Sequence, residues 1–294
     1  MKILITGCSG LIGKAIFEYF LSQGYDSYGT FHKNPILSDR VFQIDLSHII
    51  KTKKLLNQIK PDLIIHTAAI VPFDYKSKPA SIKNSLIDQN IISYCEKNDT
   101  KLVYFSSAYI YDRSVNNILT ETSALQNDKQ QYYLEQKIKS EIKIQQKLDK
   151  YLIFRVSSPI SSELKNNVVF KIFLENALKN LPIILDGSGK REQNFIYTKE
   201  IAIQCEKAIL AKNIGIYNLV YSEAISMTQL AERIIKLTNS KSKIVYKNKT
   251  AKENLVNNNF SNKKLLLSLG KKLEFTIEEA LTEIIKNYEN RSII

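Results

Sequence analysis

Apolar residues in the first half of the chain alternate between short continuous runs and longer stretches with helical spacing. The short runs, rich in β-branched residues, predict buried strands at 2–6, 26–31, 41–45, 61–69, 101–107 and 151–158. Apolar positions three or four residues apart predict helices between them, at 11–24, 47–60, 79–98 and 129–149. Strands that alternate with helices across short connections favour an α/β fold, in which helices cover both faces of a parallel sheet.

The pattern loosens from about residue 159. Helical spacing predicts a helix at 166–180, and most of the tail, 226–294, has the same spacing. The stretches 197–210 and 215–220 predict one more helix and one more strand for the sheet. We therefore expect a sheet domain at 1–158, to which residues 195–220 return, and a smaller, interleaved lobe at 159–294.

The composition is that of a globular protein, because 44% of the 294 residues are hydrophobic. No apolar run reaches membrane-spanning length, and the N-terminus lacks the long apolar core of a signal peptide. We therefore expect a cytoplasmic protein with no membrane partner. Cys8, Cys95 and Cys205 lie far apart in the sequence and the three histidines are scattered, so we expect neither a disulfide framework nor a metal site.

The net charge of +13 raises the question of an anionic partner. The excess is mostly lysine, is spread along the chain and has little aromatic interleaving, for example at 241–254. Solvated basic faces explain such a distribution better than a polyphosphate partner does. We therefore expect no nucleic-acid partner, while a small anionic substrate fits either interpretation.

A glycine-rich turn joins the first predicted strand to the first predicted helix. Three of the nine glycines in the chain fall in TGCSGLIG (6–13). Glycine here lets the backbone approach a pyrophosphate, whose charge then meets the helix N-terminus. The flanking strand and helix favour a dinucleotide-binding turn over a simple tight turn, and with it a Rossmann-type, doubly wound sheet at 1–158. The expected cofactor contacts are Gly7, Ser9, Gly10, Leu11, Ile12 and Gly13.

The ends of the next two strands bear on the choice of cofactor. NAD-selecting sites place an acid after the second strand, to accept a hydrogen bond from the ribose 2′-hydroxyl. Here His32 and Lys33 stand instead, which favours NADP(H) slightly over NAD; the alternative is that both are exposed loop residues. Asp45, followed by Leu46, is placed to accept a hydrogen bond from the adenine amino group, or is a turn residue.

The stretch QQYYLEQK (130–137) holds two tyrosines and one lysine in a predicted helix. Residues four apart lie on the same helical face, so Tyr133 and Lys137 are neighbours, whereas Tyr132 points elsewhere. A cation beside a phenol lowers its pKa and can turn it into an acid/base. By itself, the pattern is more typical of an ordinary surface pair.

These motifs together resemble the extended short-chain dehydrogenase/reductase family. Within it, the chain is similar to the NAD(P)-dependent epimerase/dehydratase group that acts on nucleotide sugars. The resemblance covers nearly the whole chain. The residues that carry it, in order, are TGCSGLIG (6–13), DL (45–46), HTAA (66–69), Asn84, FSSAYIYD (105–112), Tyr133 and Lys137, RVSSP (155–159), GSGKREQNFIY (187–197) and GIYNLVYSEAISM (215–227).

The resemblance implies roles for individual residues. Ser107 matches the catalytic hydroxyl and Tyr133 the acid/base, while Lys137 lowers the pKa of Tyr133 and holds the nicotinamide ribose. Arg155 flanks the nicotinamide or is structural. The family also implies a homodimer formed through the helices at 79–98 and 129–149. Further cofactor contacts implied by the family are Thr67, Ala68, Ala69 and Pro159, besides Tyr133 and Lys137.

Two departures from the family pattern limit the functional prediction. Sugar dehydratases follow the catalytic hydroxyl with Asp-Glu, whereas Ala108 and Tyr109 stand here, which disfavours a dehydratase. Many members carry an arginine that grips the substrate diphosphate where this chain has Gln193, and Arg191 is the candidate replacement. The expected substrate contacts are Ser107, Arg191 and Gln193.

We therefore expect an NAD(P)-dependent epimerase or ketoreductase of a nucleotide sugar. The alternatives are a non-catalytic NADP(H)-binding regulatory protein of the same fold, and a reductase of a non-nucleotide carbonyl substrate.

Overall fold

A computed structural model describes residues 1–72, 74–163, 168–248, 256–269 and 272–292. A seven-stranded sheet lies at its centre, with the strand order β10-β6-β5-β4-β1-β2-β3 and every pair parallel. The strands are β1 (Lys2–Thr6), β2 (Asp26–Phe31), β3 (Val41–Gln43), β4 (Leu63–His66), β5 (Lys101–Ser107), β6 (Tyr151–Val156) and β10 (Gly215–Leu219).

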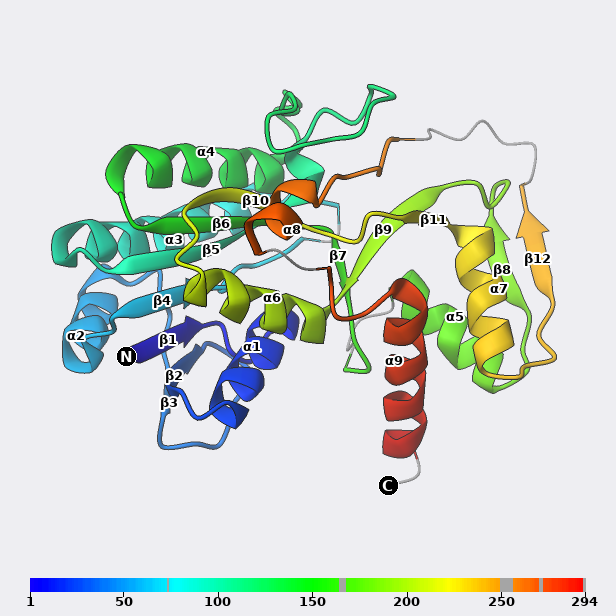
Figure 1. The fold of residues 1–294 in the computed structure, drawn as a ribbon, viewed down its shortest axis with the longest axis horizontal. Helices are drawn as coiled ribbons and strands as arrows, with labels where there is room; N and C mark the ends of the chain where they lie inside the picture. Colours follow the sequence, from blue (N-terminus) through cyan, green and yellow to red (C-terminus); the bar gives the residue numbers. More distant parts are fainter. Residues whose placement is uncertain (73, 164–167, 249–255, 270–271, 293–294) are drawn as a thin grey trace.

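Side chains of the central strands alternate between two apolar layers, as the two-residue period of a strand requires. Ile3 and Ile5 of β1 lie in one buried cluster, while Leu4 between them lies in the other. Helices α1 and α6 cover the first layer, and α2, α3 and α4 cover the second (Figure 1). These helices are α1 (Leu11–Ser22), α2 (Ile49–Ile59), α3 (Lys78–Asn98), α4 (Tyr132–Lys147) and α6 (Thr198–Leu210). The predicted parallel α/β sheet of Rossmann type is thereby confirmed.

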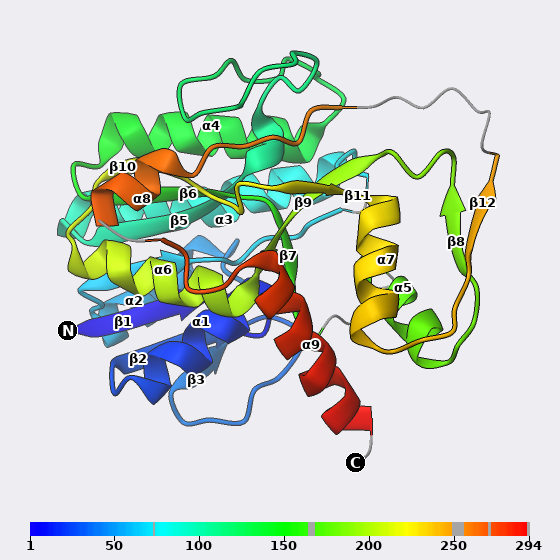
Figure 2. The ribbon, with the colours of Figure 1, turned by 45° about the vertical axis from the view of Figure 1, so that its right-hand side comes forward.

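The second half of the chain adds smaller sheets beside the central one (Figure 2). Strand β9 pairs with β7 and β11, and β8 pairs with β12. The remaining elements are η1 (Ala108–Ile110), β7 (Ser158–Ile160), α5 (Val169–Leu178), β8 (Ile183–Asp186), β9 (Glu192–Tyr197), β11 (Ala224–Ser226), α7 (Met227–Leu237), β12 (Ile244–Lys247), α8 (Lys263–Leu269) and α9 (Ile277–Ser292).

The predicted elements agree with the structure except in the tail. Helices α7, α8 and α9 confirm most of the helical pattern after residue 226, but β12 is a strand, paired in parallel with β8. Ile244 and Tyr246 are half-buried while Val245 and Lys247 are exposed, an alternation masked by the surrounding lysines. Residues 166–167 of the predicted helix and 249–254 of the lysine-rich stretch lie outside the described residues. The division of the chain at residue 158 stays a prediction, although β10 does join β6 of the central sheet.

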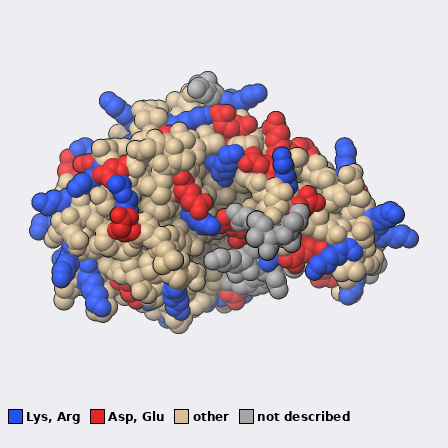
Figure 3. Space-filling view, turned by 90° about the horizontal axis from the view of Figure 1, so that it is seen from below, with Lys and Arg blue, Asp and Glu red and all other residues tan. Residues whose placement is uncertain are grey.

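Charged side chains of both signs share the surface. In Figure 3, lysines and arginines are dispersed around one face of the molecule, with acidic side chains between them. Within the described ranges, no helix has the length and hydrophobicity needed to cross a membrane.

Candidate active site

The glycine-rich turn packs against the end of β4 too closely for any side chain. A Cβ atom on Gly7 would lie 2.7 Å from the Ala68 Cα, and one on Gly13 would lie 2.3 Å from the Gly7 carbonyl oxygen. Gly7 also has a positive φ of 68°, which glycine adopts without strain. Helix α1 begins directly after Gly10, and no side chain caps it. Its N-terminal amides and positive dipole end therefore suit an anion held at the turn.

A cavity of about 410 Å³ opens beside this turn, at the carboxyl ends of β1, β2 and β4. Apolar side chains of Leu46 and Ile87 offer a surface for a base, and Lys33 and Lys83 add positive charge. These residues fit a dinucleotide. The expected cofactor contacts that line the cavity are Gly7, Ser9, Gly10, His32, Lys33, Asp45, Leu46, Thr67, Ala68 and Ala69. The others lie elsewhere: Leu11, Ile12 and Gly13 continue into α1, and Pro159 lies on β7.

Asp45 is held in place by neighbours on both sides. It accepts hydrogen bonds from Ser47 Oγ at 2.6 Å and Lys83 Nζ at 2.7 Å, and His32 Nε2 lies 3.6 Å from its Oδ2. Partial burial raises the pKa of Asp45, but the bonds from Lys83 and Ser47 outweigh it and hold the pKa well below its usual range. Asp45 is thus an ionised acceptor at the cavity wall. Lys83, which the sequence analysis did not single out, stabilises that charge.

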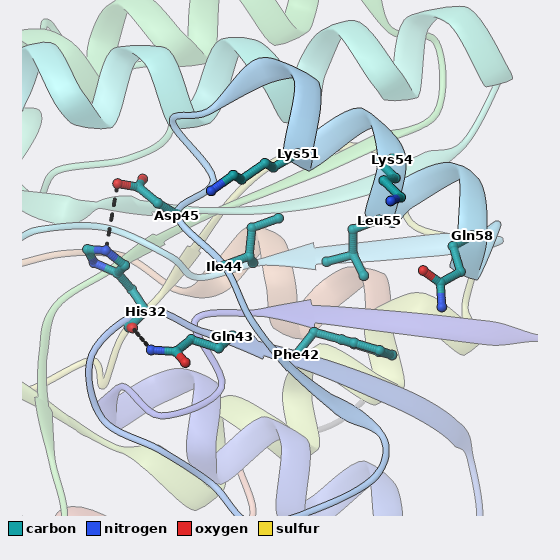
Figure 4. A pocket seen from close by; sticks show the side chains of 9 residues that line it. All are labelled: His32, Phe42, Gln43, Ile44, Asp45, Lys51, Lys54, Leu55 and Gln58. Carbon is teal, nitrogen blue, oxygen red and sulfur yellow. Dashed lines mark hydrogen bonds and ion pairs between the residues drawn. The ribbon is translucent and has the colours of Figure 1, made fainter.

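A second hollow of about 480 Å³ lies beside the cavity, between β3 and α2. Figure 4 shows His32 pointing at Asp45, with Lys51 and Lys54 on the helix above. The hollow shares His32 and Asp45 with the cavity, but no residue of the glycine-rich turn lines it. The predicted cofactor contacts therefore point to the first cavity.

Tyr133 and Lys137 lie buried on α4, next to the end of β5. Lys137 Nζ donates to the Tyr104 hydroxyl at 3.0 Å and to the Phe105 carbonyl oxygen at 2.9 Å, and lies 5.8 Å from the centre of the Tyr133 ring. The expected lowering of the Tyr133 pKa is wrong for the chain alone. Burial raises the pKa of Tyr133, and the charges of Tyr75 and Asp88 raise it further. Lys137 does not offset this rise, because its ammonium is bonded to Tyr104 and Phe105 of β5 rather than to the phenol. Tyr133 is therefore a protonated phenol at neutral pH.

Ser107 ends β5 and begins the short helical turn η1, where its Oγ accepts a hydrogen bond from the Tyr109 amide at 3.2 Å. Tyr133 packs in the same apolar cluster as Tyr109 and Ile110 of that turn. Parallel strands end at one edge of a sheet, so Ser107 after β5 and the glycine-rich turn after β1 lie at the same edge.

Two residues near Tyr133, one aromatic and one cationic, were missed by the sequence analysis. Tyr75 stacks on the Tyr133 ring, with centroids 5.4 Å apart, and has a strained φ of 61°. Arg113 lies over the Tyr109 ring, 4.7 Å from its centroid, and donates to Asn258 Oδ1 at 2.8 Å. Within the described part of the chain, no carboxylate forms an ion pair with Arg113. Arg113 could have been found from the sequence, because it directly follows the FSSAYIYD motif.

Arg191 and Gln193, the two expected substrate contacts at the start of β9, do not lie together. Gln193 donates to the Tyr109 hydroxyl at 3.2 Å and also bonds Ser158, so it belongs to the Tyr109 cluster. Arg191 is exposed and contacts Met227 Sδ at 3.7 Å. Arg155 is structural, because it forms a buried ion pair with Glu141 at 2.6 Å.

The three cysteines are buried and unbridged. Across the described ranges, no group of three or more His, Cys, Asp or Glu side chains is placed to hold a metal ion.

One curated relative is similar to about half of the chain. UDP-D-apiose/UDP-D-xylose synthase 1 from Arabidopsis thaliana is 27% identical over 155 residues, which is 47% of this chain and 39% of that protein. The chain therefore aligns with well under half of that relative's length.

Two solved structures share the fold. UDP-glucose 4-epimerase from Thermus thermophilus, in complex with NAD, has a TM-score of 0.82 at 19% identity, covering 98% of this chain and 99% of that one. dTDP-4-dehydrorhamnose reductase from Clostridium acetobutylicum has a TM-score of 0.81 at 20% identity, covering 98% and 100%. The model of the RmlD substrate binding domain family matches residues 1–290. The chain therefore belongs to this family, a branch of the extended short-chain dehydrogenases/reductases whose members are NAD(P)-dependent epimerases, dehydratases and reductases.

Proposed function

We propose that the chain is an NAD(P)-dependent ketoreductase or epimerase of a nucleotide-activated sugar, with Tyr133 as acid/base and Ser107 and Lys137 as its catalytic partners. One observation carries this proposal. A buried phenol beside a lysine lies at the same sheet edge as a glycine-rich turn that fits a dinucleotide. A protein that only binds a dinucleotide has no need of the Ser107, Tyr133 and Lys137 set.

The roles follow from the positions of the side chains. A bound nicotinamide supplies or accepts the hydride. Tyr133, protonated at neutral pH, gives a proton to the carbonyl oxygen of a keto-sugar, and Ser107 donates a hydrogen bond to the same oxygen. Lys137 stabilises the phenolate that remains, and Tyr75, stacked on the phenol, keeps water from that face of the ring.

The choice between the two reactions depends on the cofactor. His32 and Lys33 line the cavity where an acid selects NAD, which favours NADP(H). A ketoreductase consumes NADPH, so this observation supports the ketoreductase slightly more than the epimerase.

The cationic Arg113 beside Tyr109 suits an anionic substrate. Arg113 has one hydrogen bond to Asn258 within the described residues, and a guanidinium carries five N–H donors. We propose that its remaining donors bind the substrate's phosphate, together with Gln193, and that Arg191 contributes little. A reductase of a non-nucleotide carbonyl substrate is the second candidate, because the neutral Gln193 is the residue that faces Tyr109 from β9.

Homodimerisation through α3 and α4 stays a proposal. Both helices expose large apolar side chains, with Ile82 and Leu86 on α3 and Ile142 on α4 about half-exposed. Sedimentation of the wild type against an Ile82→Glu/Ile142→Glu variant tests it. Dissociation of a wild-type dimer supports this interface, and a wild-type monomer contradicts it.

A thermal-shift panel with NAD, NADP, nucleotides and nucleotide sugars tests the binding part, because each true ligand raises the melting temperature by mass action. Stoichiometric NADPH oxidation with a 4-keto sugar nucleotide identifies a ketoreductase. Cofactor that remains bound through purification, with interconversion of two sugars and no net oxidation, identifies an epimerase. Binding of NADP(H) without turnover of any carbonyl substrate identifies a regulatory protein and contradicts the proposal.

A further inference from the structure

A buried carboxylate on α3 has no part in the mechanism above. Asp88 is 1% exposed, and its carboxylate accepts four hydrogen bonds. His66 Nε2 lies 3.0 Å from Oδ1. Tyr104, Gln136 and Ser140 donate to Oδ2 at 2.6, 2.6 and 2.7 Å. An acid on the buried face of a helix is costly unless it is both bonded and balanced by charge.

The hydrogen bonds lead from Asp88 to Lys137. Tyr104 donates to Asp88 through its hydroxyl and accepts there from Lys137 Nζ at 3.0 Å. Lys137 is itself only 3% exposed. One phenolic hydroxyl thus joins the buried cation to the buried anion.

On its other side, Asp88 is linked through hydrogen bonds to the end of β4. The series ends at Ala68, which lines the cofactor cavity. The Ala68 amide donates to Thr6 Oγ1 at 3.3 Å, and Thr6 Oγ1 lies 2.6 Å from His66 Nδ1. With Thr6 donating to Nδ1 and Nε2–H donating to Asp88, every group in the series has a partner. His66 thus holds Oδ1 of Asp88, while Oδ2 accepts from Tyr104, the residue that bonds Lys137.

Among the described residues, the only other acid that acts on Lys137 is Glu141. The neighbours of Lys137 are the Tyr104 hydroxyl and Phe105 carbonyl on β5, and Tyr133 and Glu141 on α4. Glu141 is already paired with Arg155 of β6, at 2.6 Å.

We infer that Asp88 is a positioning residue, which acts through Tyr104 to keep Lys137 charged and to fix its ammonium beside Tyr133. The inference rests on the proposed function for its catalytic consequence, but the charge of Lys137 can be measured without any turnover. Burial lowers the pKa of Lys137, and the charges of Asp88 and Glu141 oppose that effect. Removing the charge of Asp88 therefore lowers the pKa of Lys137 further.

The test is an NMR titration of the full-length protein with ¹³Cε-labelled lysine, in which the Lys137 signal is assigned by its loss in a Lys137→Met variant. In Asp88→Asn, we expect the Lys137 midpoint to fall by about one pH unit or more, as loss of a nearby opposite charge predicts. Ser140→Ala is the matched control, because it removes one hydrogen bond to Asp88 but leaves the charge. Its Lys137 midpoint should equal that of the wild type.

A second readout uses the pH dependence of NADPH oxidation. If Asp88→Asn acts through the charge of Lys137, its kcat falls at pH 8 and recovers toward the wild-type value as the pH is lowered. A purely structural role lowers kcat equally at all pH values. Where Asp88→Asn does not fold, Tyr104→Phe replaces it, since loss of this acceptor must also lower the Lys137 midpoint.

An unchanged Lys137 midpoint in folded Asp88→Asn, or in Tyr104→Phe where that variant replaces it, overturns the inference. So does a fall in Ser140→Ala equal to that in Asp88→Asn. If the wild type neither reduces any carbonyl substrate with NADPH nor interconverts two sugars, the proposed function fails, while the titration still decides the role of Asp88.

Discussion

The two sides of Tyr133 differ in how completely their polar groups are bonded within the chain. Behind the phenol, Lys137, Tyr104 and Asp88 form a buried series with short hydrogen bonds and balanced charge. In front of it, Arg113 lies over Tyr109 with one hydrogen bond and with no carboxylate partner in the described residues. The charges behind the phenol are paired without a ligand, whereas the cation in front of it has donors to spare.

This difference suggests two separate tasks: the residues behind Tyr133 position the catalytic groups, and Arg113 in front of it recognises the substrate. Catalytic groups act best when their supporting shell holds them before the substrate arrives. A cation without a counter-ion gains its partner only on binding. Changes behind Tyr133 should therefore reduce stability, and changes in front of it should reduce substrate affinity.

The largest effect is expected when the buried charge pair is broken. Lys137→Met leaves Asp88 as an uncompensated buried anion, so the free energy of unfolding should fall by about 3–5 kcal/mol. The double variant Lys137→Met/Asp88→Asn removes both charges and should regain a large part of that loss. Urea unfolding measures all three proteins. Additive losses in the double variant would mean that the two charges do not interact.

The glycine-rich turn provides a test of steric crowding. Gly7 and Gly24 both have positive φ, at 68° and 78°, but a Cβ on Gly24 meets nothing within 4 Å. Alanine at either position costs backbone strain, and at Gly7 it should cost about 1–3 kcal/mol more through overpacking against Ala68. Only Gly7→Ala should also lose NADP affinity in isothermal titration. Equal losses of stability and affinity in the two variants would contradict the close approach as the reason for Gly7.

Arg113 is the corresponding test of the front side. Arg113→Gln loses the contact with the Tyr109 ring but leaves no described carboxylate without a partner, so the free energy of unfolding should fall by only about 0.5–1 kcal/mol. The KM for an anionic substrate should rise by about tenfold or more, as loss of a charged hydrogen bond predicts. Arg191→Gln is the matched control and should leave KM near the wild-type value. A larger rise in KM for Arg191→Gln than for Arg113→Gln would mean that Arg191, beside the start of β9, binds the anion instead.

The smallest effect is the dependence of stability on acidity. Burial raises the pKa of Asp88, but hydrogen bonds from His66 and Tyr104 and the charge of Lys137 bring it below its usual value. The folded protein then binds fewer protons than the unfolded chain, so this stabilisation is present above about pH 4 and is lost as the pH falls through the folded pKa. Urea unfolding between pH 7 and 3 should show a steeper loss for the wild type than for Asp88→Asn. Parallel curves would contradict the lowered pKa.

The sequence predicted the sheet and the glycine-rich turn well because local patterns determine both. Strand 101–107 and the Gly7 turn follow from short apolar runs and glycine spacing. Strand β12 was missed because surrounding lysines hide its alternation, and its partner β8 is distant in sequence.

The bonding of side chains could not be predicted in the same way. The spacing of Tyr133 and Lys137 gave their shared face, but Lys137 bonds Tyr104 on β5, a contact that only the tertiary packing of α4 on the sheet creates. The pKa of Tyr133 was consequently predicted with the wrong direction for the chain alone. Asp88 could have been found, because an acid four residues after Asn84 stands on the buried face of its helix.

The central claim is that Tyr133 is the acid/base, and its neighbour in the sequence gives the most direct test. Tyr132 begins the same helix but lies near Lys78, 6.0 Å from its ring centre, instead of near Lys137. NADPH oxidation with a 4-keto sugar nucleotide should fall by about 10²–10⁴-fold in Tyr133→Phe and stay near the wild-type rate in Tyr132→Phe. Both variants should retain NADP binding. Wild-type turnover in Tyr133→Phe would contradict the account.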